Sequence, residues 1–141
     1  MALERPFTQA LVRLRDAGLR PTRQRLALYK LLFEQGDRHV TAEALQAEAA
    51  RAGIKVSLAT IYNSLHQFTE AGLLRQVVVD GAKTYFDTNT SDHHHFYYEG
   101  DGMLSDIPGE GVQVAGLPEA PSEAEVERID VIVRLKRRHR H

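Results

Sequence analysis

Signals for the start and the end of a helix recur four times in the first half of the chain. Ser and Thr side chains accept a hydrogen bond from a backbone N–H at a helix start, and glycine adopts the left-handed conformation that ends many helices. The pairs are Pro6 and Thr8 with Gly18, Thr22 with Gly36, Thr41 with Gly53, and Ser57 with Gly72. Apolar residues lie between them at helical spacing, as in Leu26, Tyr29, Leu32 and Phe33. The pattern predicts four short amphipathic helices.

A β-hairpin is expected directly after the fourth helix. Residues 73–79 and 83–86 are rich in strand-forming side chains, and the Asp80-Gly81 pair between them is a strong turn signal. Short helices followed by a hairpin are the order of a winged helix-turn-helix, whose second motif helix enters the major groove of DNA. We therefore expect residues 1–87 to form a winged-helix DNA-binding domain, with its wing near residues 73–86.

The fourth helix has one apolar and one polar face. Leu58, Ile61, Leu65 and Phe68 would point to the core, and Thr60, Tyr62, Asn63, His66 and Gln67 would share the opposite face. Uncharged hydrogen-bonding groups are what base edges require, although many surface helices look the same. Arg20, Arg23 and Arg25 surround the start of the second helix, where the helix dipole disfavours cations. Their position suggests an external anion such as phosphate, with a solvated surface as the alternative.

The two halves of the chain carry opposite charge. Residues 1–76 contain 11 Lys and Arg against 7 Asp and Glu, a net of +4, whereas residues 77–141 contain 7 against 12, a net of −5. A basic half can contact a polyanion, and an acidic half can concentrate cations. The basic residues of the second half gather in a tail over residues 134–141, which we interpret as a frayed, solvated end rather than a binding arm.

Residues 88–141 are expected to form a small second domain. Residues 94–99, 111–117 and 129–136 are strand candidates, and Ser122 would cap a brief helical stretch that contains Ala124 and Val126. So small a sheet is unlikely to be stable alone. Pairing with a second copy would stabilise it and would supply the two-fold symmetry of many helix-turn-helix proteins. The fold class is thus α+β, a winged helix-turn-helix followed by a small α/β dimerisation domain.

The run Asp92-His93-His94-His95 opens the first of these strands. Alternate side chains of a strand point to opposite faces, so His93 and His95 should share a face and His94 should point away. Adjacent histidines are typical of metal sites, but also of solvated loops and tag fragments. The chain has no cysteine, so thiolate zinc sites, iron–sulfur clusters and disulfides are excluded. Any metal must be bound by His, Asp and Glu.

Three stretches resemble the ferric uptake regulator family. They are Gly18-Leu-Arg-Pro-Thr-Arg-Gln-Arg25, the run from Val56-Ser-Leu-Ala-Thr-Ile-Tyr-Asn to Ala71-Gly-Leu-Leu74, and Asp80-Gly-Ala-Lys-Thr-Tyr-Phe-Asp87 with the histidine run that follows. Within the family, the chain most resembles the iron response regulator branch, which senses haem status in alphaproteobacteria. This resemblance rests on the lack of Cys-x-x-Cys and on the run Asp92–Glu99. The resemblance implies a dimeric, winged-helix transcription regulator of iron and haem homeostasis, with a regulatory ligand at the hinge between its domains.

The resemblance also implies roles for residues of the DNA-binding domain. Tyr62 matches an aromatic residue that touches thymine methyl groups, and Arg15 matches a basic residue that reaches the minor groove. Asn63 stands where many relatives have Arg, which favours a distinct target sequence. Together with the polar and basic groups above, the expected DNA contacts are Arg15, Arg20, Thr22, Arg23, Arg25, Ser57, Thr60, Tyr62, Asn63 and Gln67.

The metal position of the family falls on His39, Asp87, His93, His95 and Asp106. Asp87 and Asp106 stand where Glu is usual, one methylene shorter. Mixed His and carboxylate ligands suit Fe²⁺, Mn²⁺ or Zn²⁺. The branch resemblance further implies that His93, His94 and His95 bind haem, with His94 on the face of the strand opposite His93 and His95. Tyr98 and Asp101 occupy positions of the family's thiolate zinc site, so that structural zinc is not expected.

Two other functions remain as alternatives. A metal-dependent hydrolase is disfavoured because the chain lacks His-Glu-x-x-His and any recognisable general base, so we do not expect an enzyme. A metal or haem carrier that does not bind DNA is the main rival, and binding to a promoter fragment would separate the two. Without an apolar run that could span a membrane or a recognisable leader, the chain is expected to be cytoplasmic and to have no membrane partner.

Overall fold

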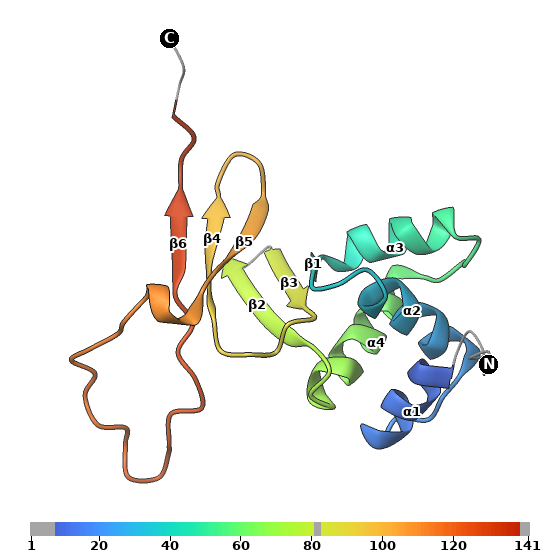
Figure 1. Ribbon diagram of the computed structural model, residues 1–141, viewed down its shortest axis with the longest axis horizontal. Coiled ribbons are helices and arrows are strands. Elements are labelled where there is room, and N and C mark those ends of the chain that lie inside the picture. The colour runs from blue at the N-terminus through green and yellow to red at the C-terminus, as the bar shows by residue number, and fades with distance from the viewer. Residues whose placement is uncertain (1–7, 81–82, 139–141) are drawn as a thin grey trace, which may run out of the picture. The chain divides into compact units, whose positions relative to one another are not determined.

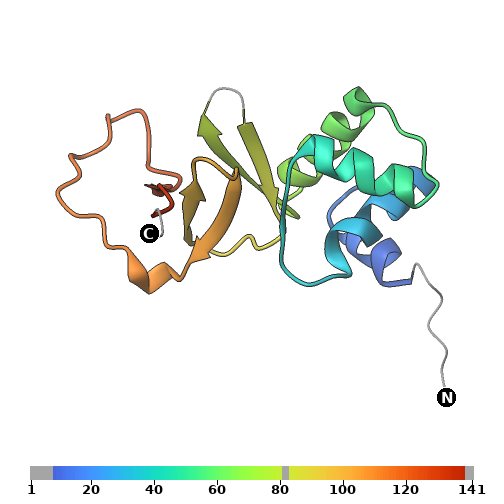
Figure 2. The ribbon, with the colours of Figure 1, turned by 90° about the horizontal axis from the view of Figure 1, so that it is seen from above.

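The structure is a computed structural model that describes residues 8–80 and 83–138. The chain divides into two compact units, residues 1–90 and residues 91–141 (Figures 1 and 2), and each is described by itself. Pro6 of the first expected helix, Gly81 of the expected hairpin turn and the last three residues of the basic tail lie outside the described residues. No helix of the described part is long and apolar enough to cross a membrane.

The four helices of the first unit confirm the predicted helix signals. They are α1 (Thr8–Asp16), α2 (Arg23–Phe33), α3 (Ala42–Arg51) and α4 (Leu58–Glu70). The hydroxyls of Thr22, Thr41 and Ser57 each accept a hydrogen bond from a backbone N–H three residues later, at 3.1 to 3.2 Å. The four predicted stop glycines all have φ between +79° and +82°. The local chemistry of the caps therefore sets the boundaries of these helices.

The core of the first unit is a continuous cluster of buried side chains. Leu14 of α1, Leu28 and Leu32 of α2, Leu45 of α3, and Ile61, Leu65 and Phe68 of α4 have no exposed surface. The spacing of Leu26, Tyr29, Leu32 and Phe33 predicts them as the buried stripe of α2. This prediction was wrong in part, because Leu28 lies in the core whereas Leu26 and Phe33 are only partly buried against it. The core of the first unit contains side chains from all four helices, so neighbouring helices cover more than one face of α2.

A three-stranded antiparallel sheet completes the first unit. The predicted hairpin is confirmed as β2 (Arg75–Asp80) and β3 (Lys83–Asp87), which form the wing. A short strand that was not predicted, β1 (His39–Val40), pairs with β3 and gives the order β1-β3-β2. In this register His39 lies opposite Asp87 and Val40 lies opposite Phe86.

The second unit contains one mixed sheet. Its strands are β4 (His94–Tyr98), β5 (Met103–Ile107) and β6 (Ile132–Leu135), in the order β5-β4-β6. β5 runs antiparallel to β4 after a tight turn, whereas β6 runs parallel to β4. A parallel neighbour requires a long crossover, and here the crossover contains the single 3₁₀ turn η1 (Gly109–Gly111) and then an irregular loop (Figure 1). The first and last predicted strands are confirmed.

Two predictions for the second unit were wrong. Residues 111–117 do not form a strand, because the left-handed Gly116 (φ +77°) interrupts the extended backbone. The strand of this region is β5, which lies directly after the turn at residues 100–102. The helix expected from Ser122 is only one turn, closed by a 2.9 Å hydrogen bond from Ala124 N–H to Pro121 O. The structure has no α-helix in residues 91–138, so the second unit is a small sheet with a long loop.

Candidate DNA interface and metal-ligand clusters

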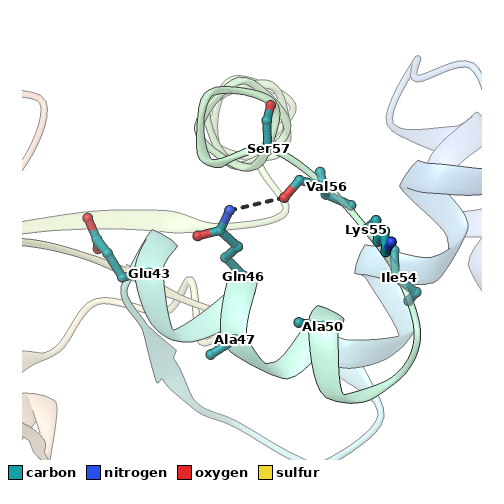
Figure 3. Close-up of a pocket in the computed structure, with 8 residues that line it drawn as sticks. All are labelled: Glu43, Gln46, Ala47, Ala50, Ile54, Lys55, Val56 and Ser57. Atoms are coloured by element: carbon teal, nitrogen blue, oxygen red, sulfur yellow. Dashed lines mark hydrogen bonds between the residues drawn. The ribbon is translucent and has the colours of Figure 1, made fainter.

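The α3–turn–α4 segment has the form of a helix-turn-helix. Gln46 on α3 donates an amide N–H to the carbonyl of Val56 at 3.1 Å, just before the N-cap of α4 (Figure 3). A hollow of about 510 Å³ lies beside this contact, with the small side chains of Ala47 and Ala50 in its lining. None of the chain's histidines lines the hollow. The hydrogen bond joins α3 to the residue that precedes the N-cap of α4.

The exposed face of α4 is the one that the sequence predicts. Asn63, His66 and Gln67 are exposed, Thr60 and Tyr62 are partly exposed, and Ile61, Leu65 and Phe68 lie in the core. Four of the predicted phosphate or base contacts, Arg15, Arg20, Arg23 and Ser57, are also exposed, and Thr22 is an exposed N-cap. The unit therefore presents exposed neutral polar groups on the second helix of its helix-turn-helix, and exposed basic groups on α1 and around the start of α2.

Tyr62 is held by one side chain of α3 and by another of α4 itself. Its hydroxyl donates to Glu43 Oε1 on α3 at 3.0 Å, and this hydrogen bond is the main cause that raises the pKa of Tyr62. Its ring is stacked with His66, with centroids 6.3 Å apart and planes inclined by 21°. The edge of His66 in turn meets the ring of Phe86 in the wing, at 5.6 Å and 79°. Tyr62 is thus fixed between α3 and the side chain of His66.

Arg25 is bound within the same unit. Its guanidinium donates to the carbonyl of Arg20 at 2.9 Å and to Gln67 Oε1 on α4 at 2.8 Å. Two residues expected as separate DNA contacts, Arg25 and Gln67, therefore contact each other. Because arginine can only donate, the amide oxygen of Gln67 must face Arg25, which directs the amide NH₂ elsewhere.

The first cluster of possible metal ligands, which we call the wing pair, consists of His39 and Asp87. His39 Nε2 lies 3.4 Å from Asp87 Oδ2, and Asp87 is 1% exposed. Asn89 donates its backbone N–H to the other oxygen of Asp87 at 2.9 Å. The residue before His39, Arg38, binds both carboxylate oxygens of Glu48 on α3 and the carbonyl of Leu31 on α2. β1 is therefore tied to two helices at the position of a candidate ligand.

The second cluster, which we call the strand triad, consists of His93, His95 and Asp106. The Nε2 atoms of His93 and His95 lie 3.2 and 3.4 Å from Asp106 Oδ1, and both rings are buried. His95 lies opposite Asp106 in the β4–β5 register. His93 Nδ1 lies 2.6 Å from the carbonyl of Ser91. This carbonyl can only accept, so Nδ1 of His93 bears the hydrogen, and the neutral ring presents a lone pair at Nε2.

The strand triad is chemically suited to a cation. A lone pair of His93 Nε2 that faces a carboxylate oxygen at 3.2 Å is repelled unless a proton or a metal ion lies between them. His95 Nε2 faces the same oxygen at 3.4 Å, and a metal ion could take the place of a proton between them. Two imidazole nitrogens and one carboxylate that converge on one point form a mixed N/O ligand set, which suits Fe²⁺, Mn²⁺ and Zn²⁺.

His94 lies on the opposite face of β4, as predicted. The burial of β4 alternates, with His95 and Tyr97 buried and His94, Phe96 and Tyr98 partly exposed. His94 Nδ1 accepts a hydrogen bond from the backbone N–H of Val131 at 3.0 Å. In the neutral ring Nε2 then bears the hydrogen, so His94 can serve as a ligand only if its hydrogen bond with Val131 is given up.

The basic tail is bound to the sheet in its described part, contrary to prediction. Arg137 pairs with Asp101 at 2.5 Å, and its guanidinium carbon lies 4.4 Å from the ring centroid of Tyr98. Arg134 of β6 pairs with Glu99 at 2.7 Å. The two positions that match the family's thiolate site are therefore occupied by an acid and an aromatic ring that share one arginine. The prediction of a frayed end neglected these partners, which precede the tail by 35 or 36 residues.

Sequence reasoning missed two residues that shape the site. Glu43 has the ordinary signature of an acidic residue in the first turn of a helix, and nothing in the sequence connects it to Tyr62, 19 residues later. Arg38 precedes a predicted ligand, and that adjacency was an available signal. Its contacts with α2 and α3 depend on how the helices pack.

Comparison with known proteins gives the same fold and a family. A ferric uptake regulation protein of Vibrio parahaemolyticus is 36% identical over 81 residues, which are 57% of this chain and 54% of that protein. The matched region thus spans about half the length of that relative. A peroxide-responsive repressor of Staphylococcus aureus is 30% identical over 106 residues, which are 75% of this chain and 71% of that protein.

The structural and family matches cover more of the chain. The crystal structure of the Vibrio cholerae ferric uptake regulator superposes with a TM-score of 0.70, over 90% of this chain and 98% of that one, at 22% identity, which shows a shared fold. Residues 16–118 match the model of the ferric uptake regulator family. This region is more than half of the chain, and the chain therefore belongs to the ferric uptake regulator family.

Proposed function

We propose that this protein is a DNA-binding transcription regulator whose affinity for DNA responds to a divalent metal ion. The observation that supports DNA binding most directly is the exposed face of α4, which is polar and uncharged and in which Gln67 contacts Arg25. Arg20 and Arg23 would contact phosphates, Arg15 would reach the minor groove, and Thr60, Tyr62, Asn63 and Gln67 would face bases. Family membership supports the same function.

We propose that one metal ion joins the wing pair and the strand triad, with His39, Asp87, His93, His95 and Asp106 as ligands. Each cluster contains imidazole and carboxylate groups in contact, and neither offers more than three ligating side chains. Only five residues separate Asp87 from His93, so their Cα atoms can be no more than about 20 Å apart in any arrangement. An ion bound by both clusters would restrict the relative orientation of the two units. Fe²⁺, Mn²⁺ and Zn²⁺ all suit these ligands.

We also propose that the protein acts as a homodimer on a two-fold symmetric operator. The second unit has few buried apolar side chains, and a partner copy would cover more of its sheet. A dimer places two α4 helices at a fixed spacing, and restricting the orientation of the units would set that spacing. In this way the metal would control DNA affinity without contacting DNA.

We further propose that the protein responds to iron or haem. The histidine run resembles that of the iron response regulator branch, and the side chain of His94 lies on the face of β4 opposite His95. His94 would hold a haem iron after giving up its hydrogen bond from Val131 N–H. The divalent metal and haem would then use different histidines of one strand.

The test is selection of bound sequences from a random pool of double-stranded DNA by the full chain, with and without Mn²⁺. We expect a two-fold symmetric consensus, an affinity that falls steeply with salt because phosphates are neutralised, and a dependence on Mn²⁺. Arg15→Ala and Arg23→Ala should weaken binding to all sequences alike. If no sequence is enriched under any condition while Mn²⁺ or haem still binds, the protein is a carrier rather than a regulator.

A further inference from the structure

An acidic side chain lies beside the exposed polar face of α4. We call this face, which carries Thr60, Tyr62, Asn63, His66 and Gln67, the reading face. Glu43 is exposed in the first turn of α3, and its carboxylate accepts the hydroxyl proton of Tyr62 at 3.0 Å. A negative charge here opposes the approach of DNA phosphates. Favourable interaction with the dipole of α3 explains an acid at this position, but it does not explain the contact with Tyr62. The hydrogen bond joins the two helices of the helix-turn-helix through the side chain that is largest on the reading face.

The Tyr62 ring is held at its other side as well. His66 stacks with it one helical turn further along α4, and Phe86, which is fully buried, supports His66 edge to face. A tyrosine on a helix surface ordinarily moves among several rotamers. With its hydroxyl bound to α3 and its ring against His66, Tyr62 is held in one of them. The position of its oxygen relative to the groove is therefore set by Glu43.

We propose that Glu43 determines sequence specificity by fixing the Tyr62 hydroxyl as a hydrogen-bond acceptor, so that Tyr62 disfavours guanine at the base it meets. This inference rests on the DNA-binding function proposed above. A phenol has one hydrogen to donate and lone pairs that accept. The hydrogen is committed to Glu43, so the oxygen can face only a donor or an apolar group.

The pattern of base edges converts this commitment into a preference. In the major groove, guanine presents only acceptors, N7 and O6, whereas adenine and cytosine present an amino donor and thymine presents a methyl group. When the hydroxyl of Tyr62 cannot donate, the lone pairs of its oxygen face the lone pairs of guanine N7 and O6, and the two groups repel each other. The other three bases offer it an amino hydrogen or an apolar surface. Without Glu43, the hydroxyl hydrogen is free to rotate toward the groove, and guanine becomes acceptable.

Two substitutions separate the charge of Glu43 from its hydrogen bond. Glu43→Gln removes the charge but keeps an oxygen that accepts from Tyr62, whereas Glu43→Ala removes both. Both variants should bind all DNA sequences several-fold more tightly at low salt, because a repelling charge is gone. Only Glu43→Ala should change the consensus. It should admit guanine at one position of each half-site and lower the preference for the wild-type consensus by about fivefold or more.

The experiment is selection from a random DNA pool by the full chain with Mn²⁺, for the wild type, Glu43→Gln, Glu43→Ala and Tyr62→Phe. Glu70→Gln, which removes an exposed charge at the far end of α4, is the control for charge alone. A double variant, Glu43→Ala with Tyr62→Phe, is tested in the same way. If Glu43 acts through the hydroxyl of Tyr62, the double variant should show the same consensus as Tyr62→Phe. Without DNA, Glu43→Ala should lower the pKa of Tyr62 toward its ordinary value, since the hydrogen bond to Glu43 raises it.

The possible outcomes distinguish this inference from the proposed function. If the wild type enriches no sequence, the proposed DNA-binding function is wrong, and Glu43 has no specificity to determine. If the wild type gives a consensus and Glu43→Ala gives the same one with the same preference, the role of Glu43 is refuted while the function stands. A change of consensus in Glu43→Gln equal to that in Glu43→Ala would refute it too, because charge would then be the cause. Unfolding curves in urea show whether any variant has lost the fold.

Discussion

The two units of the chain differ in how they are held together. In the first unit, four helices and three strands enclose a cluster of thirteen buried apolar side chains. In the second unit, the buried apolar side chains are Tyr97, Leu104 and Ile107, and residues 113–119 and 121–130 are exposed throughout. Hydrophobic burial stabilises the first unit in the ordinary way. The second unit has to depend on hydrogen bonds, ion pairs and whatever covers its sheet.

This difference suits the two units to different roles. A well-packed unit can keep α4 rigid, as the proposed DNA reading requires, whereas a thinly packed unit can respond to the proposed ligand and partner, because regions of low local stability are the ones that change state. Each unit contains one of the two clusters of candidate metal ligands. A ligand that binds the second unit would therefore add a large fraction of its stability.

The largest effect is expected from the core of the first unit. Phe68 of α4 is fully buried, and Phe68→Ala should lower the free energy of unfolding of this unit by about 3–5 kcal/mol through lost burial and a residual cavity. In urea, far-ultraviolet circular dichroism should follow the helices, and this transition should not depend on protein concentration.

The second unit should behave differently in the same experiment. If it is stabilised by a second copy, its transition should move to lower urea when the protein is diluted. Fluorescence of Tyr97 and Tyr98 in a variant whose other tyrosines are replaced by Phe would report on it. A single transition, independent of concentration and shifted as a whole by Phe68→Ala, would contradict the division into a self-sufficient and a dependent unit.

The next effect concerns metal affinity and the two faces of β4. His93→Ala removes a ring of the strand triad and should weaken Mn²⁺ binding by about 100-fold or more, because one of few ligands is lost and Asp106 loses a contact. His94→Ala is the matched control on the next residue, and it should leave Mn²⁺ affinity within a few-fold. Calorimetric titration measures both.

The haem part of the proposal is tested with the same two variants. His94→Ala should alter the absorbance spectrum of added haem, whereas its effect on Mn²⁺ should stay small. Equal, small losses of Mn²⁺ affinity for His93→Ala, His94→Ala and His95→Ala would mean that the three rings exchange as ligands, and the assignment of separate faces would then be wrong in solution.

How far the sequence predicts the structure also differs between the units. The winged helix could be predicted because its signals are local, such as Thr22, Thr41 and Ser57 at helix starts and Asp80 at the wing turn. The alternation of β4 was predicted for the same reason. The strand β5 was missed because Met103-Leu-Ser-Asp-Ile107 does not alternate cleanly between apolar and polar residues, and its place depends on pairing with β4.

The candidate site shows the same limit. His93 and His95 could be placed on one face from the pattern of a strand, but Asp106 entered the prediction only through the family resemblance. Its position opposite His95 is set by the register of β4 with β5, which no local signal specifies. The contact of Glu43 with Tyr62 depends on the packing of α3 against α4, and so it could not be predicted from residue spacing.

The smallest effect is expected at the tail, where the second unit is held by charge. Arg137 binds Asp101 and lies over the Tyr98 ring, both at the end of the β4–β5 hairpin. These side chains are largely exposed, so water and salt screen the ion pair and its contribution is small. Arg137→Ala should shift only the transition of the second unit, and only slightly. Arg138→Ala, with the same change of charge, should have less effect.

The salt dependence of this difference separates the ion pair from the contact with the ring. At about 1 M salt the Debye length is about 3 Å, so most of the difference between the two variants should disappear, and what remains measures the contact with Tyr98. A difference that persists in full at high salt would mean that Arg137 acts by packing, and equal effects of the two variants would mean that the tail is not bound to the sheet in solution.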